Sequence, residues 1–254
     1  MSINMELMKQ KLSSLRGEFE KKGDDVWWRP DDGETVIRIL PTEDGDPFKE
    51  AYFHYNVPDH KGGLLCPKRN FGERCPICDF ASQLWREGVD QNDDESKKLA
   101  KSLFVRARYF SPVVVRDQEE SARVYGYGKK AYELLLGYVL DPEYGDITDT
   151  TEGTDIVVTY SKPTRPGAYP QTSMKMKRSS SPLLDDAERV PALLETIPDI
   201  MGLFKRSSPE EIDQILDAFL SGDSGAEARS SETAKYSANE KSSVDAAFDE
   251  LLSG

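Results

Sequence analysis

Residues 101–117 read KSLFVRARYFSPVVVRD, and this stretch does most to define the fold. Aromatic and β-branched residues are enriched in strands, where successive side chains point to opposite faces. The stretch therefore predicts a long strand, or two strands divided at Ser111-Pro112, because proline cannot donate to a strand ladder. Alternation gives one face of arginine and aromatic side chains, formed by Phe104, Arg106, Arg108 and Phe110.

Shorter segments of similar composition surround this strand. They cover residues 35–41, 51–55, 123–127, 154–161 and 171–177. Residues 129–140 instead have the period of an amphipathic helix. Five or six strands interrupted by one helix suit a small mixed barrel better than a doubly wound sheet. The predicted fold class is therefore mainly β with helices, that is, α+β.

Charge is sorted along the chain. The 254 residues carry a formal net charge of -13, which by itself argues against nucleic acid as a partner. From Lys97 to Lys130, however, there are 9 basic and 3 acidic residues, a net of +6. From Ser207 to Gly254 there are 11 acidic and 3 basic residues, a net of -8. The average thus hides a basic middle and an acidic end.

The chain reads as a cytoplasmic protein without a membrane partner. No stretch approaches the ~18 consecutive apolar residues of a membrane helix. The first residues, MSINMELMKQKL, lack the apolar region of a secretory signal. All three cysteines lie between Cys66 and Cys78, and such a grouping in an intracellular chain indicates metal binding before disulfides.

The pattern His54-x11-Cys66-x8-Cys75-x2-Cys78 predicts one structural zinc ion per chain. Three thiolates and an imidazole form a closed tetrahedral set, which leaves no position for a catalytic water. His60 is the alternative fourth ligand, and we favour His54 because it lies in an extended, ordered segment. A helix over 79–87 is expected to follow the C-x-x-C turn, so the metal module spans about 54–90. Reduced cysteines without metal and a thioredoxin-type redox pair are the weaker alternatives.

Basic and aromatic residues interleave over the middle of the chain. Arginine neutralises phosphate, and aromatic rings stack on unpaired bases, which duplex DNA hides. The pattern therefore predicts a groove for single-stranded DNA, with no catalytic residues. The candidate DNA-binding residues are Phe104, Arg106, Arg108, Phe110, Arg116, Arg123, Tyr125, Tyr127, Lys129 and Lys130, with Lys175 and Lys177 on a second rim.

Both ends are predicted to be separate from the DNA-binding core, which spans 23–206. Residues 1–22 have a helical apolar period, and 207–254 form an acidic tail with a helix over 209–220. Residues 221–243 have little to bury and should be disordered. The tip, 243–254, is acidic and amphipathic, and its candidate partner-binding residues are Val244, Phe248, Leu251 and Leu252. A tethered polyanion competes with DNA for a basic groove, and the tail becomes free for partners when DNA displaces it.

In these features the chain resembles the zinc-containing single-stranded DNA-binding proteins of T-even-type tailed phages. The resembling stretches span most of the chain in the family's order. They are VIRILP (36–41), PF (47–48) leading to His54, the Cys66…Cys78 group, VVVRD (113–117), VYGYGKKAYE (124–133) and FDELL (248–252).

The resemblance implies an OB-fold barrel core with the zinc module inserted between its strands. It implies cooperative, sequence-tolerant coating of single strands during phage replication, recombination and repair. It also implies that residues 1–22 contact the neighbouring protomer, and that the tail recruits replication and recombination proteins. It further favours His54 as the fourth ligand.

Two other functions fit parts of the sequence. A metal-dependent nuclease would use the clustered carboxylates Asp141, Glu143, Asp146 and Asp149, although they lie in a turn-rich stretch without a suitably spaced lysine. A zinc-bearing adaptor would use the amphipathic ends without DNA. Cleavage of single strands would favour the first, and DNA-independent protein binding the second.

Overall fold

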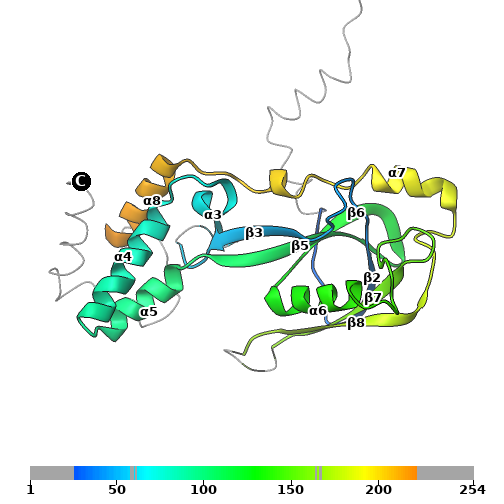
Figure 1. Ribbon diagram of the computed structural model, residues 1–254, viewed down its shortest axis with the longest axis horizontal. Helices are drawn as coiled ribbons and strands as arrows, with labels where there is room; N and C mark the ends of the chain where they lie inside the picture. Colours follow the sequence, from blue (N-terminus) through cyan, green and yellow to red (C-terminus); the bar gives the residue numbers. More distant parts are fainter. Residues whose placement is uncertain (1–25, 58–59, 61, 164, 166–167, 222–254) are drawn as a thin grey trace, which may run out of the picture. The chain divides into compact units, whose positions relative to one another are not determined.

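A computed structural model describes residues 26–57, 60, 62–163, 165 and 168–221 (Figure 1). The predicted N-terminal segment, the disordered region and the tail tip with Val244, Phe248, Leu251 and Leu252 lie outside the described residues. The described chain forms two compact units. Among the described residues, the sheet unit comprises 26–50 and Arg108–Phe204, and the metal unit comprises Ala51–Ala107 and 205–221.

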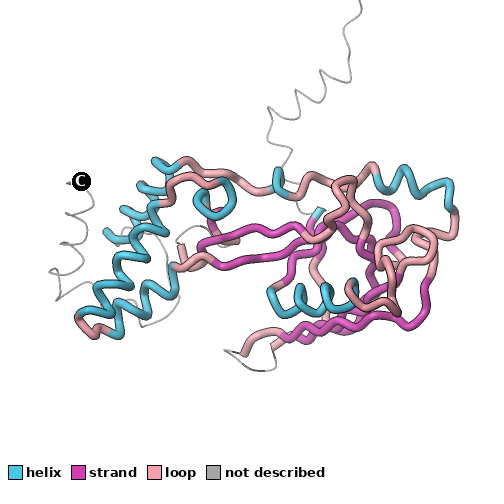
Figure 2. The backbone as a smooth tube through the Cα atoms, in the orientation of Figure 1, coloured by secondary structure: helices cyan, strands magenta, loops and turns pink. Residues whose placement is uncertain are grey.

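Strands dominate the sheet unit, and helices dominate the metal unit (Figure 2). The strands are β1 (Trp27–Trp28), β2 (Gly33–Ile39), β3 (Lys49–His54), β4 (Leu64–Leu65), β5 (Arg106–Val115), β6 (Gln118–Tyr127), β7 (Thr154–Ser161) and β8 (Gln171–Ser180). The helices are α3 (Pro67–Phe71), α4 (Pro76–Asp90), α5 (Asp94–Leu103), α6 (Lys129–Val139), α7 (Val190–Leu194) and α8 (Pro209–Ser221), with 3-10 turns η1 (Ala187–Arg189) and η2 (Met201–Leu203).

The sheet is mixed, with the strand order β1-β6-β5-β2-β7-β8, and β3 pairs with both β5 and β4. The β1–β6 pair is parallel, and the pairs β2–β5, β2–β7, β3–β4, β5–β6 and β7–β8 are antiparallel. The order leaves the sheet open, and OB-folds are themselves partly open barrels. The α+β class is confirmed, and the cysteine segment is inserted between β3 and β5.

Strand β5 runs unbroken through Pro112, which resolves the one-strand or two-strand alternative. The Pro112 carbonyl accepts a hydrogen bond of 2.9 Å from the Leu40 amide. Proline has no N–H group with which to return that bond, so the ladder between β2 and β5 ends at this point. The proline therefore marks the limit of one pairing instead of the limit of the strand.

The start of the predicted strand was wrong, because residues 101–103 belong to α5. Asp93 accepts a hydrogen bond from the Glu95 amide at the start of this helix, where acidic side chains also favour the helix dipole. Ala100 and Leu103 lie on its buried face, and Phe104 caps its C-terminus. Phe104 is therefore not on the strand that carries Arg106 and Arg108. The predicted strand over 154–161 matches β7, and the predicted helix over 129–140 matches α6.

A charged network lies in the interior of the sheet unit. Arg38 is fully buried and donates from Nε to Asp155 Oδ1 at 2.9 Å. Arg116 donates to the same oxygen at 2.7 and 3.0 Å. Burial raises the pKa of Asp155, but the hydrogen bonds from Arg116 and the charge of Arg38 lower it by more. The net result is a pKa below the ordinary value of 3.8. The network thus holds one buried carboxylate between two guanidinium groups.

The metal unit has its own apolar core, in which α4 and α8 pack together. Ile212 and Leu216 on α8 are 0 % and 7 % exposed and contribute to this core. Ser208 accepts a hydrogen bond from the Glu211 amide, while Glu211 accepts one from the Ser208 amide, as in a capping box. The helix that the sequence grouped with the acidic tail is therefore part of the metal unit.

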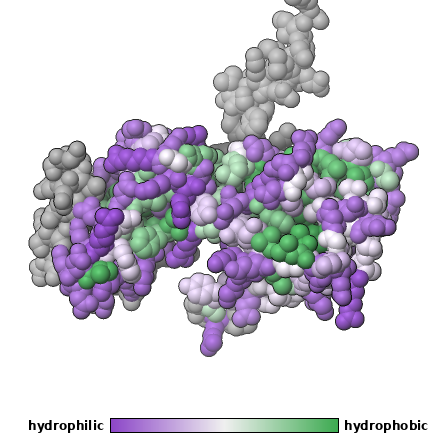
Figure 3. All heavy atoms as spheres, viewed as in Figure 1, coloured by the Kyte–Doolittle hydropathy of each residue, from purple (hydrophilic) through white to green (hydrophobic). Residues whose placement is uncertain are grey.

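The surface is mainly hydrophilic on the face shown in Figure 3, with apolar patches between the polar side chains. Exposed apolar residues on and just after α6 are Leu134, Val139 and Leu140. Among the described helices, none combines the length and hydropathy that a membrane span requires.

Candidate metal centre and nucleic-acid interface

The four predicted metal ligands come together from three elements of the metal unit. His54 ends β3, Cys66 precedes α3, and Cys75 and Cys78 lie at the start of α4. Cys66 and Cys75 are each followed by proline at the first helical position, and neither sulfur caps its helix. Both helix starts therefore leave their sulfur atoms directed to the cluster.

The donor atoms fit one zinc ion. His54 Nε2 lies 3.3 Å from Cys75 Sγ and 3.5 Å from Cys78 Sγ, and Cys66 Sγ lies 3.5 Å from Cys78 Sγ. All four donor atoms lie within 4.8 Å of one another. Tetrahedral zinc with bonds of about 2.0 Å to nitrogen and about 2.3 Å to sulfur separates its ligands by about 3.5–3.8 Å. The Cys3His set thus matches a closed structural zinc site, and His60 is not part of it.

Neighbouring groups fix the orientation of the donors. His54 Nδ1 lies 2.7 Å from the Leu103 carbonyl oxygen, so Nδ1–H donates and Nε2 faces the sulfurs. Asn70 donates to the carbonyls of Tyr52 and Cys66 at 2.8 and 2.7 Å, and accepts from the Tyr52 amide at 3.0 Å. These bonds tie the Cys66 turn to β3 and preserve the distance between His54 and the sulfurs.

The four donor groups lie close enough to shift one another's pKa values. Burial lowers the pKa of His54, but hydrogen bonds to Cys66 and Cys75 raise it to about 10. Hydrogen bonds with Cys75 and Cys78 lower the pKa of Cys66, while those with Cys66 and Cys75 raise the pKa of Cys78. Thiolate charge so close together needs a positive partner, which a zinc ion supplies more fully than a protonated imidazole.

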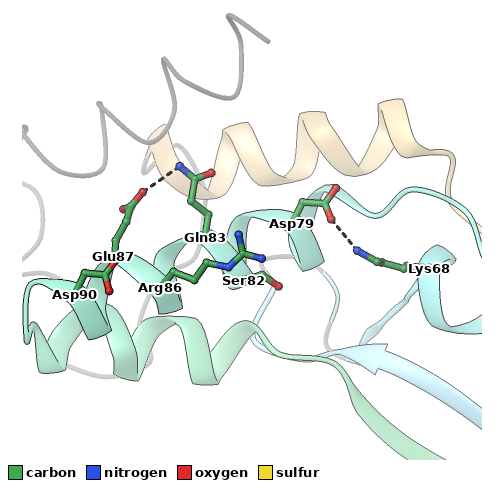
Figure 4. A pocket seen from close by; sticks show the side chains of 7 residues that line it. All are labelled: Lys68, Asp79, Ser82, Gln83, Arg86, Glu87 and Asp90. Carbon is green, nitrogen blue, oxygen red and sulfur yellow. Dashed lines mark hydrogen bonds and ion pairs between the residues drawn. The ribbon is translucent and has the colours of Figure 1, made fainter.

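A hollow of about 590 Å³ on α4 differs in chemistry from a DNA site (Figure 4). Its lining side chains are Lys68, Asp79, Ser82, Gln83, Arg86, Glu87 and Asp90. Lys68 pairs with Asp79 at 3.0 Å, and Gln83 donates to Glu87 at 3.0 Å. The lining has three acids against two bases and no aromatic ring, so it offers little to a polyanion.

The predicted DNA-binding residues separate into exposed bases and packed rings. Exposed side chains are Arg106, Arg108, Lys129, Lys130 and Lys175. Packed rings are Phe110, Tyr125 and Tyr127, which are 6 %, 5 % and 4 % exposed. Burial raises the pKa of Tyr125 to about 12 and that of Tyr127 still further, so both phenols stay neutral. These three rings therefore pack in the core of the sheet unit and present little surface to a ligand.

Arg108 lies across β6 and donates to the Gly126 carbonyl at 3.1 Å. A side chain at Gly126 would come within 2.8 Å of the Phe110 ring, so glycine allows this ring to lie over β6. Phe104 belongs to the metal unit, where its ring centroid lies 5.9 Å from that of Trp85. Phe104 therefore lies outside both β5 and the sheet unit that contains Arg108 and Phe110.

Two predicted bases are engaged within the sheet unit. Arg116 belongs to the Asp155 network, and Lys177 Nζ lies 3.4 Å from Asp155 Oδ2. Arg123 is half-buried and lines a hollow beside β1. Lys129 and Lys130 begin α6, and Lys129 pairs with Glu133 at 3.4 Å on the surface.

Two further aromatic positions lie outside the predicted DNA-binding set: Tyr132, which ends the interleaved basic and aromatic run, and Tyr169, which sequence reasoning missed. Tyr132 stacks on Tyr109 with ring centroids 3.9 Å apart, and Phe48 approaches its ring edge-on at 5.9 Å. Tyr169, between β7 and β8, is 88 % exposed. Its position among Pro and Gly near Arg165, in RPGAYP (165–170), is the sequence signal that could have identified it.

Three of the four carboxylates considered for a nuclease hold turns in the sheet unit. Asp141 accepts from the Glu143 amide at 3.0 Å, and Asp146 accepts from the Thr148 amide at 2.8 Å. Asp149 accepts from the amides of residues 151 and 152 at 2.7 and 2.8 Å. These bonds are typical of Asx turns and account for the carboxylates structurally.

Comparison with known families agrees with this geometry. No match was found among curated proteins. The family model described as gp32 DNA binding protein like matches residues 31–220, most of the chain and nearly all of the described residues. Because the matched region contains the whole Cys3His set, the chain belongs to the gp32-like family of single-stranded DNA-binding proteins.

Proposed function

We propose that this protein coats single-stranded DNA without sequence preference in replication, recombination and repair, and that it performs no catalytic step. The family match over residues 31–220 is the observation that carries this proposal. Exposed bases on β5, α6 and β8 supply contacts to phosphate, which every sequence shares. Tyr169 is exposed and Tyr132 is half-buried, and we add both rings to the proposed DNA surface as groups that stack on bases.

Zinc has a structural role in this proposal. Four protein ligands would fill its coordination sphere, and metal binding would contribute free energy to folding of the metal unit. Residues 1–22 would contact the next protomer along the strand, and the tail tip would recruit replication and recombination proteins. Both of these roles follow from the resemblance to the phage single-stranded DNA-binding proteins.

The first test removes two charges from the proposed surface. The double variant Lys129→Ala/Lys130→Ala should bind poly(dT) more weakly, and its affinity should depend less steeply on salt. The slope of log K against log salt should fall by about 0.7 for each lost phosphate contact. Fluorescence anisotropy titrations over a salt series measure both quantities.

The matched control is Arg189→Ala/Lys205→Ala, which removes two exposed charges outside the proposed surface. Its affinity and salt slope should stay near those of the wild type. A wild-type protein that binds duplex DNA as tightly as poly(dT) would refute the single-strand preference. Equal effects of the two double variants would refute the assignment of Lys129 and Lys130.

A further inference from the structure

A second hollow, of about 370 Å³, opens beside β1 in the sheet unit. Its lining residues are Trp27, Trp28, Arg29, Asp31, Gln118 and Arg123. The parallel pairing of β1 with β6 places Trp27 opposite Val124 and Trp28 opposite Tyr125. This pairing brings the two indoles to the strand that carries Arg123.

The guanidinium group of Arg123 contains an unsatisfied hydrogen-bond donor. Its Nε is buried and has no hydrogen-bond partner among the described residues. A buried donor without a partner loses its hydrogen bonds to water, and this loss destabilises a charged group more than a neutral one. In the same unit Arg38 and Arg116 both donate to Asp155, so an unpaired guanidinium nitrogen is an exception there. Arg123 is therefore a candidate for binding an external acceptor.

The other lining groups restrict the class of ligand. Within the described part of the chain, neither Arg29 nor Arg123 forms an ion pair, and Asp31 leaves the lining with a net charge of +1. Trp28 is 8 % exposed, and its ring packs edge-on against that of Tyr125 with ring centroids 4.8 Å apart. Its indole therefore forms a rigid side of the hollow. Guanidinium groups donate hydrogen bonds to phosphate oxygens. An indole ring can pack against a base, and an amide can form hydrogen bonds with the edge of the base.

We propose that this hollow binds one nucleotide of the single strand, with the phosphate on Arg123 and Arg29 and the base beside the indoles. The proposal rests on the proposed function and adds a subsite to it, at which β1 becomes part of the DNA surface. Gln118 supplies an amide that can both donate to and accept from a base edge without selecting one base.

Tryptophan fluorescence tests this proposal directly. The chain has three tryptophans, so Trp85→Phe leaves Trp27 and Trp28 as the only ones, and both line the hollow. Titration of this variant with oligo(dT) should change its indole emission. Arg123→Gln in the same background should lower oligo(dT) affinity about tenfold, as expected for loss of a charge-assisted hydrogen bond. Arg189→Gln is the control, because it removes an exposed charge elsewhere in the unit.

Anisotropy of a labelled oligo(dT) separates the two proposals, since it reports binding anywhere on the protein. Binding by anisotropy without an indole change, and with equal affinity for Arg123→Gln and Arg189→Gln, would overturn the nucleotide subsite alone. Absence of binding by wild-type protein in dilute salt would overturn the proposed function. If Arg123→Gln fails to fold by circular dichroism, Arg29→Gln, at an exposed position, gives the same comparison.

Discussion

Single residues decide the metal site, and the choice between His54 and His60 is the clearest case. The sequence offered both, and the extended segment around His54 favoured it. The structure confirms the grouping, because His54 ends β3 with Nδ1 against Leu103 and Nε2 against the sulfurs. The contact with Leu103 could not be read from sequence, since 49 positions separate the two residues.

Replacement of each histidine tests this assignment. His54→Gln should lower zinc content well below one per chain and reduce thermal stability, because a structural zinc site contributes free energy to folding. His60→Gln should keep the full zinc content. Metal analysis after dialysis, with thermal melts followed by circular dichroism, measures both effects. Full zinc retention by His54→Gln would contradict the ligand assignment.

The buried Asp155 is a second case at this scale, and one that sequence could not reveal. Arg116 belonged to the basic run that predicted a DNA surface, yet it donates to a carboxylate 39 positions later. The sequence shows how many basic side chains a segment carries. Ion pairs formed in the fold determine which of those side chains are available to bind a ligand.

Asp155→Asn should destabilise the protein by about 3–5 kcal/mol, because it leaves the buried guanidinium of Arg38 without its counterion, whereas Arg116 still pairs with Glu119 at 2.9 Å. The pKa of Asp155 is lowered, so its contribution is complete above the ordinary value of 3.8 and is lost as pH falls below it. The difference in unfolding free energy between wild type and variant should therefore narrow below about pH 4. Urea titrations at several pH values measure it, with Asp185→Asn as an exposed control. A difference that stays constant with pH would argue against this charge pairing.

At the scale of elements, the strands were more predictable than their ends. The period-two pattern identified β7 and β8, and the helical period identified α6. The boundary between α5 and β5 was missed because Leu103 and Phe104 fit both an apolar helix face and a strand. The N-cap at Asp93 begins α5 outside the stretch that suggested a strand, and the C-cap at Phe104 ends the helix within that stretch.

Helix α8 links the metal unit to the chain that follows it. Because Ile212 is fully buried in the core shared with α4, Ile212→Ala should cost about 2–5 kcal/mol. Cys75 and Cys78 lie at the start of α4, so the variant should also release zinc to a chelator faster than wild type. Chelator competition and thermal melts test this, with the exposed Gln214→Ala as control. Equal rates of zinc release from the two variants would show that packing of α8 does not stabilise the metal site.

For the molecule as a whole, the distribution of charge is the property that sequence reveals most directly. The count gave a basic segment within an acidic chain, and the structure leaves Arg106, Arg108, Lys129 and Lys130 of that segment exposed. It also shows why the rings were harder to assign. Phe110 and Tyr127 pack in the core, whereas Tyr169 lies on the surface outside the basic run.

The same charge distribution predicts how the tail acts on DNA binding. Truncation after Ser221 keeps α8 in the metal unit and removes only the chain beyond it. The removed segment, 222–254, carries 7 acidic and 3 basic residues, and we expect it to compete with DNA for the basic surface at high effective concentration. The truncated protein should bind poly(dT) more tightly than the full chain, and the gain should be largest at low salt, where screening is weakest. Truncation before Ser208 would also remove α8, so lost binding there would report unfolding of the metal unit instead. Equal poly(dT) affinity of the full chain and the Ser221 truncation across the salt series would show that the tail does not compete.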